Sequence, residues 1–74
     1  MMNEDKQRIC DLMLLALQAT RDAADLTELE YENDEVNQRE LVTATFIGGG
    51  FRIINVSMDS GTAMIKDIIN HLGC

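Results

Sequence analysis

Residues 41–72, LVTATFIGGGFRIINVSMDSGTAMIKDIINHL, carry the clearest structural pattern of this chain. Residues 41–47 and 51–58 alternate between apolar and polar side chains and are rich in Val, Ile, Thr and Phe, which is typical of β-strands. The three glycines at 48–50 interrupt the alternation and predict a hairpin turn, because glycine adopts positive φ without strain. Beyond residue 59, apolar side chains recur every three or four positions, which predicts a helix.

The register of this hairpin follows from a three-residue loop. Such a loop sets these residues opposite each other: Ile47 and Phe51, Ala44 and Ile54, Val42 and Val56. One face then carries the core side chains, with Arg52 at its edge: Val42, Ala44, Phe46, Ile54, Val56 and Met58. The other face carries polar side chains and an apolar group near the turn: Thr43, Thr45, Asn55, Ser57, Ile47, Phe51 and Ile53. A register shifted by one residue would bring Asn55 into the core, so we reject it.

The two helices are predicted on either side of the strands. Residues Glu4 to about Ala24 predict the first, with Asn3 as its N-cap. Its apolar stripe is wider than one sheet face would cover, and Leu15 lies among the polar positions, so we expect a second contact surface there. The last helix is predicted to start at Asp59-Ser60-Gly61-Thr62, with Asp59 or Ser60 as N-cap, and to end at Gly73. The stripes comprise Ile9, Cys10, Leu12, Met13, Leu14, Ala16, Leu17, Ala19, Ala23 and Ala24 in the first helix, and Met64, Ile65, Ile68, Ile69 and Leu72 in the last.

A further strand is predicted at residues 26–32, LTELEYE, with Leu29 and Tyr31 on one side and three glutamates on the other. Charges of this kind suit an edge strand. Asn33-Asp34-Glu35 predicts a turn, and Val36–Glu40 fits either a loop or the start of the next strand. The sequence therefore predicts an α+β fold, a two-layer α-β-β-β-α domain whose three antiparallel strands are covered on one face by both helices.

The composition predicts a single domain in a soluble, cytoplasmic protein. The 74 residues include 13 acidic and 6 basic side chains, for a formal net charge of −7. Eight acids lie close together with Arg39 as the one base among them: Asp22, Asp25, Glu28, Glu30, Glu32, Asp34, Glu35 and Glu40. Such a surface repels phosphate backbones, so direct nucleic-acid binding is not expected. No signal-peptide pattern opens the chain, and no apolar run is long enough to span a membrane.

The residues predict no metal site, no cofactor and no catalytic group. His71 is the only histidine, and Cys10 and Cys74 form no CxxC motif, so a structural zinc is not expected. Cys10 is predicted to be a small buried hydrophobe in a reduced protein, with a Cys10–Cys74 disulfide open as an alternative. His71 fits a helix end, where the dipole favours a cation. No motif places a histidine or lysine to activate Ser60, so an enzyme is not predicted.

Small-ligand binding is the third and weakest hypothesis. One site would be an anion at the turn Asp59, Ser60, Gly61 and Thr62, although helix capping explains that turn better. Another would be a divalent cation at Glu28–Glu35, although the EF-hand pattern is absent and a solvated strand face explains those acids better. The glycines at 48–50 join two strands, whereas a phosphate-binding loop joins a strand to a helix.

Residues 43–72 resemble the C-terminal half of short proteins of unknown function from phages and mobile elements of Gram-positive gut bacteria. Those proteins are similar in carrying a strand that ends in Asn-Val, followed by D-S-G-x-A-M-I-x-D-I. The matching residues here are Asn55, Val56, Asp59, Ser60, Gly61, Ala63, Met64, Ile65, Asp67 and Ile68. This resemblance implies a phage-related origin and no particular activity.

The α-β-β-β-α order also resembles the double-stranded RNA-binding domain. That family presents lysines to phosphates at the start of its last helix, whereas this chain has an acidic turn there and only Lys66 further on. The likeness is one of topology, and function does not follow from topology. The second hypothesis is a nucleic-acid-related role, either through degenerate RNA-binding-domain ancestry or through an acidic decoy that occupies a DNA-binding protein.

The leading hypothesis is a small, acidic, non-enzymatic protein–protein interaction module that forms a homodimer and has an unknown protein partner. Small domains are marginally stable, and self-association is a common source of added stability. The predicted self-association surface comprises apolar residues of the first helix and of the hairpin: Ile9, Leu12, Leu15, Ile47, Phe51 and Ile53.

Overall fold

The order of helices and strands confirms the predicted α+β class. The computed structural model describes residues 5–73. Its elements are α1 (Lys6–Gln18), β1 (Leu26–Asp34), β2 (Arg39–Phe46), β3 (Phe51–Asn55) and α2 (Gly61–Leu72). The strands form one antiparallel sheet in the order β1-β2-β3, so β1 is an edge strand as predicted. Within residues 5–73, neither helix has the length and hydrophobicity needed to cross a membrane.

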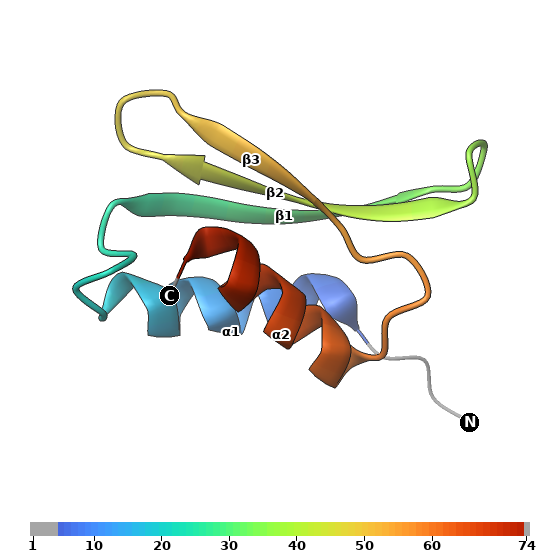
Figure 1. The fold of residues 1–74 in the computed structure, drawn as a ribbon, viewed down its shortest axis with the longest axis horizontal. Helices are drawn as coiled ribbons and strands as arrows, with labels where there is room; N and C mark the ends of the chain where they lie inside the picture. The colour runs from blue at the N-terminus through green and yellow to red at the C-terminus, as the bar shows by residue number, and fades with distance from the viewer. Residues whose placement is uncertain (1–4, 74) are drawn as a thin grey trace.

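Both helices lie on the same side of the sheet and leave its other face open (Figure 1). The core between the two layers consists of Cys10, Leu17, Ala23, Leu26, Leu29, Val42, Ala44, Ile54, Val56, Met64 and Ile68. Val42, Ile54 and Ile68 have no exposed surface. Burial of each such side chain stabilises the fold by about 1.5–3 kcal/mol, so the alternation in β2 and β3 and the apolar face of α2 supply much of the folding free energy.

Helix α1 is shorter than predicted. Its N-cap is Asp5, whose carboxylate accepts a hydrogen bond from the Arg8 N–H at 3.0 Å; the predicted cap, Asn3, lies outside the described residues. The predicted end near Ala24 is wrong, because the Thr20 hydroxyl donates to the Leu17 carbonyl at 2.6 Å and accepts from the Ala23 N–H at 3.2 Å. The resulting turn brings Ala23 into the core.

The connection between β1 and β2 also differs from the prediction. β1 continues to Asp34, so the turn predicted at residues 33–35 is wrong, and the turn occupies residues 35–38 instead. Arg39 and Glu40 begin β2, which resolves the ambiguous segment Val36–Glu40 into a turn followed by a strand. The Asp34 carboxylate accepts hydrogen bonds from the Asn37 backbone and side chain, at 3.3 and 2.7 Å, and so stabilises the later turn.

The β2–β3 hairpin has the predicted faces but not the predicted register. Val42 lies opposite Ile54, and Thr45 lies opposite Phe51, which is two residues away from the predicted pairing. The Phe46 N–H donates to the Gly50 carbonyl at 2.8 Å, so the loop consists of residues 47–49 and not of the three glycines. The Ile47 N–H, which lies in this loop, donates to the Asp25 carbonyl at 2.9 Å. A shift of two residues keeps every side chain on its face, so the core residues of both strands are those predicted.

The segment after β3 corrects one core residue. Met58 was predicted to face the core but is 98% exposed, because β3 ends at Asn55 and Met58 adopts a positive φ of 64°. The N-cap of α2 is Ser60, whose hydroxyl accepts from the Ala63 N–H at 3.1 Å. Gly73 ends α2 at a φ of +76°, which favours glycine.

Candidate functional site: the open edge and open face of the sheet

The outer edge of β1 is covered by two glutamine side chains from α1. The Gln7 Oε1 accepts a hydrogen bond from the Tyr31 N–H at 2.9 Å, and its Nε2 lies 3.5 Å from the Leu29 carbonyl. The Gln18 Nε2 donates to the Leu26 carbonyl at 2.9 Å. These side-chain amides bond backbone groups that a neighbouring strand would use, so they cover part of the outer edge of β1.

The outer edge of β3 has no such cover. The Val56 N–H donates to the Glu40 carbonyl and the Phe46 N–H donates to the Gly50 carbonyl, so the even-numbered residues of β3 face β2. The backbone groups of Phe51, Ile53 and Asn55 therefore point outward. Within residues 5–73, no hydrogen bond reaches these outward groups. The side chains beside this edge are bonded within the chain: the Arg52 Nη1 donates to the His71 carbonyl of α2 at 2.6 Å, and the Asn55 Oδ1 accepts from the Ser57 N–H at 2.9 Å.

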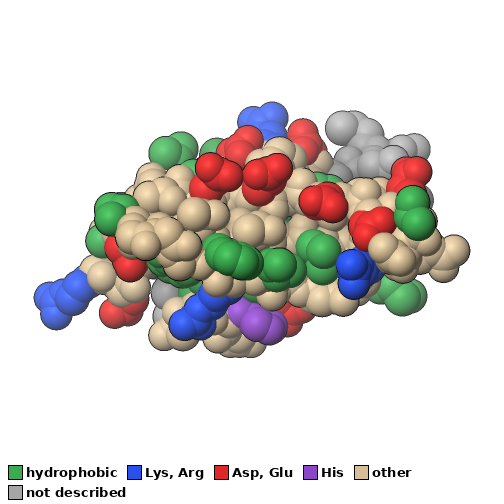
Figure 2. Space-filling model, turned by 90° about the horizontal axis from the view of Figure 1, so that it is seen from above, with side chains coloured by type: hydrophobic (Ala, Val, Ile, Leu, Met, Phe, Trp, Pro, Cys, Tyr) green, Lys and Arg blue, Asp and Glu red, His purple; other side chains and the backbone are tan. Residues whose placement is uncertain are grey.

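The open face of the sheet carries side chains of a different kind on each strand. Three rows cross it from β1 to β3: Glu28, Thr45 and Phe51; Glu30, Thr43 and Ile53; Glu32, Leu41 and Asn55. Figure 2 views this face and shows a line of acidic side chains running beside a line of hydrophobic ones. β1 thus contributes negative charge, β2 contributes mainly threonine, and β3 contributes exposed apolar surface.

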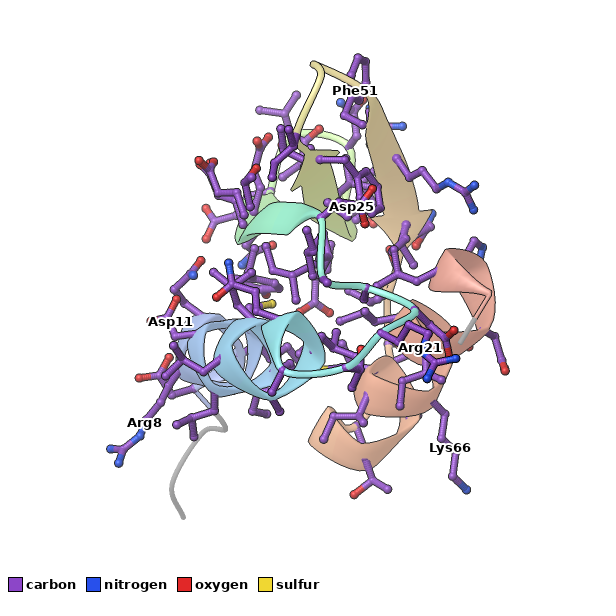
Figure 3. All side chains as sticks on the ribbon, turned by 90° about the vertical axis from the view of Figure 1, so that its left-hand side faces the viewer. Arg8, Asp11, Arg21, Asp25, Phe51 and Lys66 are labelled. Atoms are coloured by element: carbon purple, nitrogen blue, oxygen red, sulfur yellow. The ribbon has the colours of Figure 1, made fainter. Side chains whose placement is uncertain are left out.

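The structure divides the predicted self-association surface into two parts. Ile47, Phe51 and Ile53, which we name the hairpin patch, are 71%, 64% and 57% exposed. Ile9 is half-buried on α1, where Leu12 and Leu15 are 58% and 67% exposed. Figure 3 shows Phe51 on the sheet side of the molecule and the α1 residue Arg8 on the helix side. The two parts therefore belong to different layers of the fold.

A shallow groove between the helices brings together residues from both predicted sites. It has a volume of about 430 Å³ and is lined by Asp5, Arg8, Ile9, Leu12, Gly61, Thr62 and Ile65. The lining is mainly apolar and includes the opposite charges of Asp5 and Arg8. The groove thus has no single sign of charge to select a partner.

The turn at residues 59–62 holds negative charge of its own. The hydrogen bond to Asp67 raises the pKa of Asp59, and burial and the Asp67 charge raise it further. Two carboxylates can share a hydrogen bond only when one of them carries a proton. When both are ionised, the buried Asp59 Oδ2 has no hydrogen-bond partner among the described residues. Ser60 caps the helix, as the sequence allowed. This geometry favours capping over anion binding, because an incoming anion would meet both carboxylates.

A polar cluster that sequence reasoning missed joins α1 to the sheet. The Lys6 Nζ lies 2.7 Å from the Glu40 Oε2, and the Tyr31 hydroxyl donates to the same oxygen. The Lys6 bond, followed by the Tyr31 bond, lowers the pKa of Glu40. Burial, followed by the bond to Glu40, raises the pKa of Tyr31 to about 12. Because the Lys6 and Glu40 charges neutralise each other, we interpret this cluster as a structural clip. The one sign of it in the sequence was the alternation in β1, which predicted that Tyr31 faces α1.

The remaining predicted residues have structural positions. Cys10 is a free, fully buried thiol, and burial, followed by the Asp11 charge, raises its pKa to about 11. Cys74, the other half of the possible disulfide, lies outside the described residues. The His71 Nδ1 lies 2.9 Å from the Asp67 carbonyl at the end of α2. Over residues 5–73, no group of three or more His, Cys, Asp or Glu side chains is placed to hold a metal ion.

No protein-family model, curated protein or solved structure matches this chain. The two resemblances drawn from the sequence therefore stay predictions.

Proposed function

We propose that this protein is a non-enzymatic interaction module that forms a homodimer by pairing β3 with β3 of a second copy. The observation that carries the proposal is the difference between the two sheet edges. α1 supplies Gln7 and Gln18 to the edge of β1, whereas the edge of β3 keeps outward backbone groups beside the exposed Phe51 and Ile53. An uncovered edge strand with apolar side chains is a template for strand pairing.

The edge of β3 is complementary to itself. An antiparallel pair centred on Ile53 sets Ile53 opposite Ile53 of the second copy and Phe51 opposite Asn55. Each of the three outward residues then exchanges backbone hydrogen bonds, about six in all, each with a net contribution of about 0.5–1.5 kcal/mol. The product is a continuous six-stranded sheet with the two Ile53 side chains side by side at its centre.

The charge distribution favours this edge over face-to-face packing. In the paired sheet the two β1 strands lie about 24 Å apart, five strand spacings, which is about three Debye lengths at physiological ionic strength. If two open faces packed on each other instead, Glu28, Glu30 and Glu32 would meet side chains of the second copy. Depending on the direction of the two-fold axis, these would be the same three glutamates or the apolar side chains of β3. Either arrangement buries charge without a partner.

Sedimentation equilibrium over a concentration series tests the proposal. We expect a monomer–dimer equilibrium that Ile53→Lys shifts to monomer, because a charge at the centre of the edge opposes pairing. Leu15→Lys is the matched control on α1, with a similarly exposed side chain and the same change of charge, and should leave the dimer intact. A parent protein that stays monomeric, or a dimer lost in Leu15→Lys and kept in Ile53→Lys, contradicts the proposal.

Amide hydrogen exchange gives a second test that reads the backbone directly. The amides of Phe51, Ile53 and Asn55 point outward in the monomer and should become protected as the protein concentration rises. The amides of Arg52 and Ile54 face β2 and should show protection that is independent of concentration.

A further inference from the structure

We infer that the open face of the sheet binds a basic amphipathic helix of another protein. The face combines two features that a single partner segment would have to match. Glu28, Glu30 and Glu32 form an acidic line on β1, and Leu41 with the exposed Phe51 and Ile53 forms an apolar line on β2 and β3. The inference does not depend on dimer formation, because each copy carries the complete face.

The acidic line has no counterion of its own. Arg39 is the one base of β1–β3 on the open face, and its Nε is engaged with the Asp34 carboxylate at 3.4 Å. Arg52 belongs to the opposite face, where it bonds the His71 carbonyl. Among residues 5–73, no base pairs with Glu28, Glu30 or Glu32. These glutamates add to a formal net charge of −7, which attracts a cationic partner and repels nucleic acid.

The spacing of the two lines fits a helix. β1 and β3 are two strand spacings apart, about 10 Å, which is close to the diameter of an α-helix with its side chains. Alternate residues on β1 are about 6.6–6.8 Å apart, and basic residues one turn apart on a helix repeat about every 5.4 Å. The difference between these two spacings is small enough for flexible lysine side chains to reach successive glutamates. A helix lying along β2 therefore places basic side chains over β1 and apolar side chains over β3. The threonines of β2 beneath it are small enough to allow close approach.

The alternative occupants fit less well. A second copy would set glutamates against glutamates or against apolar side chains, as described for face-to-face packing. The groove between the helices lacks a comparable line of charge, since Asp5 and Arg8 oppose each other there. A basic amphipathic helix satisfies both lines of the open face at once.

The test uses a synthetic 18-residue helical peptide with lysines along one flank and leucines along the other, and a scrambled peptide of the same composition. Fluorescence anisotropy should show saturable binding of the amphipathic peptide that weakens with added salt. Amide chemical shifts should change at Thr43, Thr45 and Ile53. Equal binding of the scrambled peptide, or shifts confined to the groove between the helices, overturns the inference.

A matched pair of variants separates the face from the overall charge. Glu28→Gln/Glu30→Gln/Glu32→Gln should weaken peptide binding by about tenfold or more, whereas Asp11→Asn/Asp22→Asn/Glu35→Gln should change it by less than about twofold, although both remove three charges. Asp11 lies on α1, away from the open face (Figure 3). Equal weakening by the two variants would mean that only net charge matters, which overturns the inference. The glutamine variant should dimerise as the parent does, so failure here is distinguishable from failure of the proposed pairing.

Discussion

The Nζ of Lys6 lies 2.7 Å from the Oε2 of Glu40, and this one carboxylate joins the start of α1 to both β1 and β2. Its other oxygen accepts a hydrogen bond from the Met58 N–H at 3.3 Å, and the Glu40 N–H donates to the Ser57 hydroxyl at 2.9 Å. Four segments of the chain therefore meet at Glu40.

Glu40→Gln should lower the free energy of unfolding at neutral pH by about 1–2 kcal/mol. This corresponds to a Tm decrease of roughly 4–16 °C for a domain of this size. Because the Lys6 and Tyr31 bonds lower the pKa of Glu40, its contribution is present above the unfolded-state pKa and is lost as the pH falls through the folded-state value. Thermal unfolding as a function of pH should show the variant and the parent converging in acid. A constant difference at every pH would contradict this assignment.

Tyr31 should make the protein lose stability in alkali. Its pKa is raised from 10.0 to about 12, so its contribution is complete below pH 10 and is lost as the pH rises from about 10 to about 12. Tyr31 is the only tyrosine, so phenolate absorbance reports its titration without interference. Tyr31→Phe should flatten this part of the stability profile. Titration near pH 10 in the folded protein would show that the hydroxyl is not held by Glu40.

Asp59→Asn should stabilise the protein at neutral pH. The pKa of Asp59 is raised mainly by its bond to Asp67, so the favourable, protonated state is present below the unfolded-state pKa and is lost as the pH rises through the folded-state value. The variant should therefore have a higher Tm than the parent at neutral pH and an equal Tm in acid. Asp67→Asn should raise the Tm by a similar amount. The double variant should gain no more than either single variant, because both substitutions remove the same Asp59–Asp67 repulsion.

Gln7→Ala should destabilise the fold by about 1–3 kcal/mol, because the Tyr31 N–H loses its partner. It should also convert dimers into larger assemblies, since both edges of each copy would then be open. Light scattering measures the size, and Gln7→Ala/Ile53→Lys should stop at dimers. Asn70→Ala, on the exposed side of α2, is the control that should leave size unchanged. If Gln7→Ala forms dimers and no larger assemblies, Gln7 does not protect the edge of β1.

The hairpin glycines should differ in their tolerance of alanine. Gly48 and Gly49 have φ values of +98° and +92°, so Gly48→Ala or Gly49→Ala should cost about 1–3 kcal/mol. Gly50 has no positive φ and open space around it, so Gly50→Ala should change stability by less than about 1 kcal/mol. Denaturant titrations measure all three variants. Equal costs at the three positions would show that backbone conformation does not determine the effect.

Periodicity predicted the elements and their faces because these depend on short-range patterns. The alternation in β2 and β3 identified Val42, Ala44, Ile54 and Val56 as core residues, and a register error of two residues did not disturb this result. In the observed register Ile47 lies in the loop and its N–H donates to the Asp25 carbonyl, a contact between distant segments that no local pattern encodes. The end of α1 was misjudged for a similar reason, because burial of Ala23 outweighs its helix propensity.

The candidate site was predictable in part. Ile47, Phe51 and Ile53 were identified from alternation, and the acidic side of β1 from its glutamates. The sequence did not show that Gln7 covers one edge, because a surface glutamine on a helix has many partners open to it. It also grouped α1 with the hairpin patch, since apolar residues alone do not reveal which side of a molecule they occupy.

The bond from Arg52 to the His71 carbonyl has a consequence for docking. Arg52 belongs to β3, the strand that offers its edge to a second copy, and His71 lies in the last turn of α2. A shift of β3 on contact would alter this bond, so an isotope label at His71 should report events at the strand from the opposite layer. The protein thus carries a reporter group next to the strand that offers its edge to a second copy.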